Sequence, residues 1–318
     1  MRPKLAIKAQ WILIVGLLLE ASIQGATPPT LPSEDRILQS SLELERRTMP
    51  WCPHECAMIV PFIADYRHGS DHLVFVGVQH VFRPGTPTMR AVAAGFDAIK
   101  AKVVILEGFP TAMGESPMPL VQEAHRYGRP DAEPFAHGEA MYAASLALAR
   151  GIPFIGGEPT KAEEIQILKT KGFTDADIAF RSLLGWLSQA VRAAAIPDMS
   201  EQSIKKIYPA LVEDVWTQNH LQAPSFDELQ QRYRAVYGVN IVGDDVTARI
   251  DHVFDKTRYG SMDQIGMVTR DRNLLGLIEQ QLTDRHSVLV VYGGSHWATL
   301  SSALEKRFGK PSIRPFIN

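Results

Sequence analysis

The chain has 318 residues, of which 45% are hydrophobic and 21% charged, and its formal net charge is −2. This composition is typical of a globular protein and excludes an intrinsically disordered chain. The balanced charge, without a run of lysine or arginine, also argues against nucleic acid as a partner. The length suits one large domain, or one domain that carries a sizeable insertion.

The first 26 residues show the pattern of an export signal. Arg2, Lys4 and Lys8 form a basic start, residues 11–19 (WILIVGLLL) form an apolar run, and small residues follow up to Ala26. The apolar run is about half as long as the ~20 residues that a membrane span needs. We therefore expect a signal peptide over residues 1–26 and a periplasmic or secreted protein. Only an uncleaved N-terminal segment would then contact a membrane.

The next segment joins this signal to the folded domain. Residues 27–49 are rich in proline, serine and charge, which is typical of a linker, so we expect the domain to cover residues 50–318. The two cysteines follow in the sequence WCPHEC, as Cys52 and Cys56. In an exported chain they indicate a small-loop disulfide. A metal knuckle that uses His54 and Glu55 is the alternative, although the spacing matches no zinc finger or haem-attachment pattern.

From residue 50 onward, apolar runs alternate with helical patterns, which predicts an α/β fold with a mostly parallel sheet flanked by helices. Strands are predicted at 73–77, 103–106, 153–155, 287–292 and 313–317. Helices are predicted at 86–100, where Thr86-Pro87 forms the start, and at 138–150, 262–282 and 297–308. Residues 160–260 show only helical spacing. They predict a helical insertion, which we expect to cover the functional edge of the sheet as a lid. A helical domain packed elsewhere, on a face of the sheet or as a dimer contact, is the alternative.

Polar side chains follow four of the predicted strands. His80 follows the strand at 73–77, Glu107 the strand at 103–106, Glu158 the strand at 153–155, and His296 the strand at 287–292. Ligands of open α/β sheets bind at the carboxyl ends of the strands. The sequence therefore predicts that two imidazoles and two carboxylates meet at one edge of the sheet.

Both histidines belong to a Gly-x-x-His motif, as Gly77 to His80 and Gly293 to His296. Glycine at such a place indicates either a positive φ or close approach of the backbone to a ligand. One such motif has little meaning, since a turn histidine is common. Two of them, each behind a buried strand and with strand-end carboxylates between, favour a functional site.

Two helical segments carry further polar residues. The sequence RDRN, from Arg270 to Asn273, leads us to assign Arg272 to stabilisation of an oxyanion, with Asn273 as a second member of the site. The segment that contains His137 and Glu139 has a simpler explanation, because a carboxylate is favourable at a helix N-terminus.

Other catalytic classes fit less well. The sequence GGSHW nearly matches a Gly-x-Ser-x-Gly nucleophile motif around Ser295, but Trp297 replaces the last glycine. The sequence contains no P-loop, no Gly-x-Gly-x-x-Gly and no His-Glu-x-x-His. Mixed histidine and carboxylate ligation suits a divalent transition metal (Mn, Co or Zn) that activates water. The expected ligands are His80, Glu107, Glu158 and His296.

The order of GVQH, LEGFP, RDRNLLGLIEQQL and VVYGGSHW resembles that of the TraB/TIKI family. This family belongs to a wider superfamily with erythromycin-esterase-like and ChaN-like proteins. The resemblance covers about residues 58–317, with HGEAMYAASLALARGIPFIGGEP as a weaker match and the insertion poorly matched.

The resemblance implies an α/β fold of the EreA/ChaN-like type. Its TIKI branch implies a membrane-tethered, metal-dependent protease, although this sequence shows no clear C-terminal membrane segment. The esterase branch implies metal-independent ester hydrolysis by histidine and glutamate, and the ChaN branch implies haem binding without catalysis. We therefore expect an exported, metal-dependent hydrolase of peptides or small-molecule esters. A haem- or metal-binding protein without turnover is the alternative.

Overall fold

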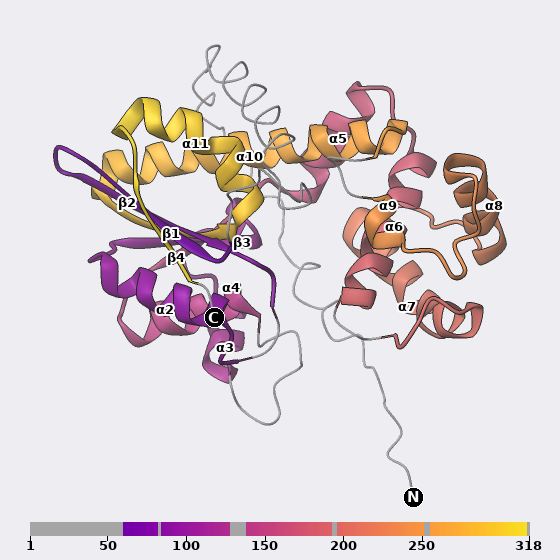
Figure 1. Cartoon of the computed structure of the whole chain (residues 1–318), viewed down its shortest axis with the longest axis horizontal. Helices are drawn as coiled ribbons and strands as arrows, with labels where there is room; N and C mark the ends of the chain where they lie inside the picture. The colour runs from indigo at the N-terminus through magenta and orange to yellow at the C-terminus, as the bar shows by residue number, and fades with distance from the viewer. Residues whose placement is uncertain (1–59, 82–83, 128–137, 193–195, 251–254, 317–318) are drawn as a thin grey trace, which may run out of the picture. The chain divides into compact units, whose positions relative to one another are not determined.

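The computed structural model describes residues 60–81, 84–127, 138–192, 196–250 and 255–316. Within these ranges the chain forms two compact units (Figure 1). We call residues 60–160 and 265–316 the α/β unit, and residues 161–264 the helical unit. The expected signal peptide (1–26), the expected linker (27–49), and Cys52 and Cys56 lie outside the described residues.

The α/β unit is built on one mixed sheet with the strand order β4-β3-β5-β2-β1-β6. Its strands are β1 (Phe62–His68), β2 (Asp71–Val78), β3 (Val103–Pro110), β4 (Phe154–Glu158), β5 (Ser287–Gly293) and β6 (Ser312–Pro315). The neighbours among β4, β3, β5 and β2 are parallel, whereas β1 is antiparallel to β2 and to β6. The four parallel strands and the last strand thus overlap the ranges that the sequence predicts.

Strand β1 is not among the predicted strands. Its sequence, FIADYRH, carries Asp65, Arg67 and His68, so it lacks the continuous apolar run that marks the central strands. The alternating residues Phe62, Ala64 and Tyr66 are nevertheless buried on one face of the sheet. The strand forms a hairpin with β2, and this hairpin makes the sheet mixed.

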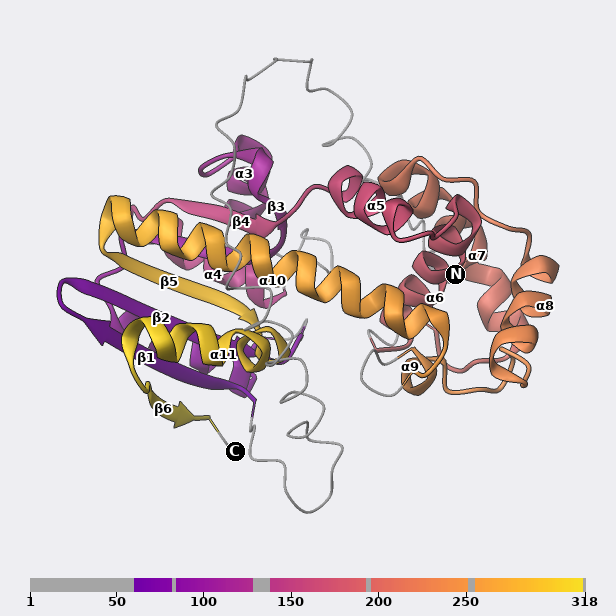
Figure 2. The same cartoon turned by 90° about the horizontal axis from the view of Figure 1, so that it is seen from above.

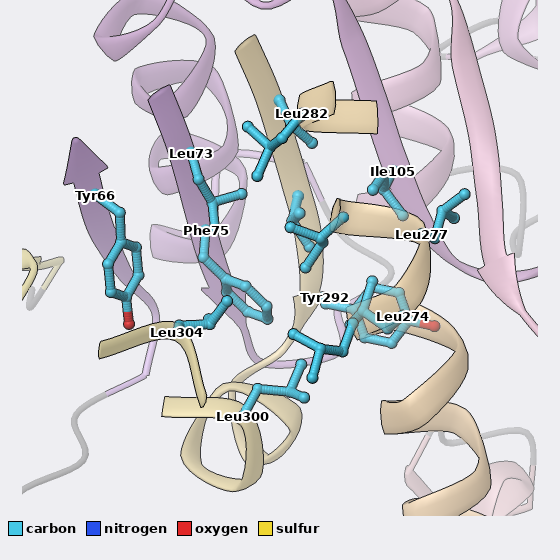
Figure 3. Packing of buried hydrophobic residues seen from close by; sticks show 14 of the residues in the cluster. Tyr66, Leu73, Phe75, Ile105, Leu274, Leu277, Leu282, Tyr292, Leu300 and Leu304 are labelled. Carbon is cyan, nitrogen blue, oxygen red and sulfur yellow. The ribbon is translucent and has the colours of Figure 1, made fainter. Parts of the chain in front are cut away.

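Helices cover both faces of the sheet (Figures 1 and 2). The helices α10 (Arg258–Arg285) and α11 (Gly294–Phe308) pack on one face, and α2 (Pro87–Ala98), α3 (Met118–Arg126) and α4 (Glu139–Ala149) pack on the other. Figure 3 shows the first of these two cores. Along β2, Leu73 and Phe75 belong to this core, whereas Val74 and Val76 belong to the second one. Burial on both faces explains why the central strands are apolar throughout.

Helix boundaries follow local capping chemistry. The Thr86 side chain accepts a hydrogen bond from the Met89 N–H, and Pro87 is the first residue of α2, as the sequence predicts. Helix α10 begins at Arg258 rather than at 262 and ends at Arg285 rather than at 282, so it is longer at both ends than the sequence predicts.

The helical unit contains α5 (Lys161–Thr170), α6 (Asp175–Arg192), α7 (Glu201–Asn219), α8 (Phe226–Tyr237), α9 (Val246–Arg249) and the first residues of α10. No strand occurs among its described residues. The apolar stripe of α6 is buried at Phe180, Leu183, Leu184 and Leu187. The expectation that this unit acts as a lid stays a prediction.

Among the helices in the described part of the chain, none is long and apolar enough to cross a bilayer.

Candidate functional site

The strand order explains how the predicted residues meet. In the spatial order β4-β3-β5-β2, each strand is parallel to its neighbour. Glu158 ends β4, Glu107 lies near the end of β3, His296 follows β5, and His80 follows β2. These side chains therefore lie together at the carboxyl ends of four adjacent strands, within the α/β unit.

Glu107 is the centre of the site, and it is buried with 8% exposure. Its Oε1 lies 2.7 Å from Arg270 Nη2, 3.4 Å from His296 Nε2 and 3.7 Å from His80 Nε2. Its Oε2 accepts a hydrogen bond of 2.6 Å from the Gly293 N–H. Burial alone would raise the pKa of Glu107, but the charges of His80, His296 and Arg270 hold this pKa well below its usual value.

His80 is the most open member of the site, because 53% of its side chain is exposed. Its Nδ1 lies 2.5 Å from Glu139 Oε1, and the other oxygen of Glu139 accepts a hydrogen bond of 3.0 Å from the Val81 N–H. The charge of Glu107, helped by the hydrogen bond to Glu139, outweighs the effect of burial and raises the pKa of His80 to about 9. A carboxylate at Nδ1 leaves Nε2 as the nitrogen that can react.

His296 has the same kind of partner but a closed environment. It is 2% exposed, in the first turn of α11, and its Nδ1 lies 2.5 Å from Asp271 Oδ1. Its ring meets the Tyr292 ring edge-on, with 5.0 Å between the centroids. Burial alone would lower the pKa of His296, but the charge and hydrogen bond of Asp271 raise it to about 10. His296 is therefore a buried cation at neutral pH.

Arg270 joins the two strand-end glutamates. Its Nε donates to Glu158 Oε2 at 2.6 Å, and its Nη2 donates to both Glu158 Oε1 at 2.6 Å and Glu107 Oε1 at 2.7 Å. The Tyr292 hydroxyl also donates to Glu158 Oε1, at 2.7 Å. Burial would raise the pKa of Glu158, but the charge and hydrogen bonds of Arg270 lower it. Glu158 thus holds Arg270 in place beside Glu107.

The structure places the predicted arginine differently. Arg272 is exposed, and Arg270 makes the contacts with the carboxylates that we had assigned to Arg272. Two residues correspond to about 200° of rotation around a helix, so these two side chains leave α10 on nearly opposite sides. Asn273 lies one turn from Arg270 and donates hydrogen bonds to Thr111 Oγ1 at 3.0 Å and to the Gly157 carbonyl at 2.7 Å. Asn273 therefore fixes the backbone of the site.

Four contributors to this network were given no role in the site from the sequence. Glu139 had an ordinary explanation as a helix-start carboxylate. Arg270 and Asp271 were present in the RDRN segment, where the helical period alone could not decide which residues face the sheet. Tyr292 belongs to an apolar strand run, and its sequence position gives no sign that its hydroxyl reaches Glu158. These contacts depend on tertiary packing between distant segments.

The expected metal does not fit this arrangement. Among the described residues, no group of three or more His, Cys, Asp or Glu side chains is placed to hold a metal ion. Of the expected ligands His80, Glu107, Glu158 and His296, both glutamates are bound to the guanidinium of Arg270. A second cation there would be repelled by this fixed charge. The metal (Mn, Co or Zn), expected from the mixed histidine and carboxylate residues, stays a prediction, as does the alternative haem, which the resemblance implies.

Comparison with known proteins found no matching family profile, no matching curated protein and no matching solved structure. The resemblance to the TraB/TIKI family therefore stays a prediction that depends on the short motifs and their order.

Proposed function

We propose that this protein is an exported hydrolase that cleaves an ester or amide bond by acid–base catalysis at the carboxyl edge of the sheet. The observation that carries the proposal is the pair formed by His80 and Glu139. His80 Nδ1 lies 2.5 Å from the Glu139 carboxylate, while the half-exposed ring faces the buried charges around Glu107. A histidine held by a carboxylate, with its other nitrogen accessible, is a typical general base.

The proposed reaction begins with the neutral form of His80. Its Nε2 accepts a proton from a water molecule, whose oxygen bonds to the carbonyl carbon of the substrate. The imidazolium that forms is stabilised by Glu139 and Glu107. The same proton then passes to the leaving oxygen or nitrogen as its bond to carbon breaks. The products are a carboxylic acid and an alcohol or amine, so atoms and charge balance.

The two buried cations have a separate role in this proposal. Negative charge develops on the carbonyl oxygen when water adds to the carbon. Arg270 and protonated His296 provide fixed positive charge beside Glu107, and neither needs to reorient during the reaction. Such preorganised charge stabilises an oxyanion more strongly than solvent does, because its orientation is already set.

The chain offers a matched control for the test. His286 lies at the opposite end of the sheet, just before β5, with its Nδ1 2.8 Å from Asp71 Oδ1 and 59% of its side chain exposed. His286 and His80 thus each have a carboxylate partner, and their side chains are similarly exposed, but only His80 contacts the proposed site.

The experiment is an assay of the purified protein on a panel of aryl esters and peptides at pH 7 to 10, beside His80→Ala and His286→Ala. We expect His80→Ala to lower kcat/KM by about 10²–10⁴-fold, the usual contribution of a general base. We expect His286→Ala to keep the activity. Equal activity in the wild type and His80→Ala, or no turnover of any substrate by the wild type, would contradict the proposal.

A further inference from the structure

The side chain that Gly293 lacks would lie between the two histidines and Glu107. A Cβ atom added to Gly293 would lie 3.3 Å from Glu107 Oε2, 3.6 Å from His80 Nε2 and 3.6 Å from His296 Cδ2. Apart from atoms of the residues next to Gly293 in the chain, these are the three atoms nearest to the added Cβ. The space beside Gly293 is therefore bordered by three of the side chains that the hydrolytic proposal uses.

The backbone does not require glycine at this position. Gly293 has φ −52° and ψ 137°, a conformation that most residues adopt without strain. Gly156 provides a contrast, since a Cβ there would lie 2.1 Å from the Phe109 carbonyl oxygen. At Gly156 a side chain has no room, whereas a methyl group at Gly293 would make close contact with Glu107 Oε2 and ordinary van der Waals contact with the two histidines. Glycine at position 293 therefore keeps this space beside the site free of a side chain.

We infer that this space binds the oxygen atom of the attacking water, and this inference rests on the proposed function. A water in contact with Gly293 Cα lies on the side toward His80 and Glu107. It donates one hydrogen to His80 Nε2 and the other to Glu107 Oε2, which leaves a lone pair for the substrate carbon. A methyl group on residue 293 would occupy the same space and exclude the water.

The first test is the substitution Gly293→Ala, with Gly276→Ala as the control. Gly276 lies in α10, and a Cβ added there would meet no atom within 4 Å. We expect Gly293→Ala to keep the fold, since its closest new contact is 3.3 Å from a carboxylate oxygen that can move slightly. We expect its kcat to fall about 10²-fold or more, because loss of reactant positioning has effects of this size. Gly276→Ala should keep both fold and kcat.

The second test does not depend on turnover. In crystal structures of the wild type and Gly293→Ala, we expect an ordered water within hydrogen-bond distance of His80 Nε2 and Glu107 Oε2 only in the wild type. If the wild type hydrolyses nothing, the proposed function fails, and the water position is still decided by these structures. A Gly293→Ala protein with wild-type kcat, or a wild-type crystal structure without this water, would overturn the inference.

Discussion

The two Gly-x-x-His motifs have the same spacing but different structural surroundings. After β2 the chain continues without forming a helix directly, and His80 keeps 53% of its side chain exposed. After β5 the helix α11 begins immediately at Gly294, so His296 lies in its first turn and is 2% exposed. The element that follows each strand, rather than the motif itself, decides whether the histidine is open or buried.

The glycines of the two motifs also differ in what they accommodate. A Cβ on Gly77 would lie 2.2 Å from the Phe62 ring, so this glycine makes room for the core. A Cβ on Gly293 would instead lie near His80 and Glu107, at the site. Neither is among the described glycines with positive φ, so a left-handed turn is not the reason for glycine in either motif. An identical motif thus serves packing in one place and the site in the other.

Removal of the buried histidine should have the largest effect on stability. His296→Ala would leave Asp271 and Glu107 as buried carboxylates without this partner, so we expect the free energy of unfolding to fall by about 3–5 kcal/mol. His80→Ala should cost less, because 53% of the His80 side chain is exposed, so water can take its place beside Glu139, which also keeps its hydrogen bond from the Val81 N–H. Urea denaturation at pH 7 measures both values, and equal losses would show that the two histidines have equivalent surroundings.

The same variant has a pH dependence of known sign. His296 has a folded-state pKa of about 10, raised from an ordinary 6.5, so its stabilising contribution is complete below pH 6.5 and lost as the pH rises through about 10. The stability difference between wild type and His296→Ala should therefore shrink between pH 7 and pH 10.5. A difference that grows over this range would contradict the assignment of His296 as a buried cation.

The open histidine should control the rate. The pKa of His80 is raised to about 9, chiefly by Glu107, so at pH 7 this side chain carries a proton and cannot act as a base. We expect kcat/KM to rise about tenfold per pH unit below pH 9 and to fall again above about pH 10, where His296 loses the proton that stabilises the oxyanion. Glu139→Gln, which removes a second cause of the raised His80 pKa, should move the rising part of the curve to lower pH. A rate that falls as the pH rises from 7 to 9 would instead identify His80 as a general acid.

The first glycine should affect stability rather than the position of water. In Gly77→Ala, the new methyl group would overlap the Phe62 ring, which is 2% exposed and packs edge-on against Trp297. Overpacking of this kind costs about 1–3 kcal/mol. Thermal melting should therefore show a clear loss of stability for Gly77→Ala and little change for Gly293→Ala. A larger loss of stability for Gly293→Ala than for Gly77→Ala would contradict these separate roles of the two glycines.

The sequence predicted the central sheet and the convergence of its polar residues because both depend on local signals. Continuous apolar runs mark β2, β3 and β5, and the parallel order then brings His80, Glu107 and His296 to one edge. The hairpin strand β1 was missed, because its charged residues hide an alternating pattern. The partners Glu139 and Asp271 gave no clear signal, because their roles arise only when α4 and α10 pack beside the strand ends.

The choice between Arg270 and Arg272 illustrates the same limit. Both belong to one short segment, and both are plausible partners for a strand-end glutamate. Only the rotation of α10 against the sheet determines that Arg270 meets Glu107 and Glu158. This rotation depends on the packing of Leu274, Leu277 and other core residues of the helix. A contact of this kind is a property of the assembled core, and spacing along one segment does not fix it.

The smallest expected effect concerns metal, and it tests whether the two histidines act separately. If both histidines bound one ion, as the expected ligand set His80, Glu107, Glu158 and His296 predicts, they would act together. The guanidinium of Arg270 lies 2.7 Å from Glu107 and 2.6 Å from Glu158, so a divalent cation would have to displace it or be repelled by it. We therefore expect turnover to be unchanged after exhaustive chelation. The variant Arg270→Lys keeps the positive charge but loses the contact with both glutamates.

Metal analysis of the purified protein should be combined with addition of Mn, Co or Zn to the chelated sample. Loss of activity on chelation, with recovery on addition of one of these ions, would contradict the metal-independent reaction proposed above.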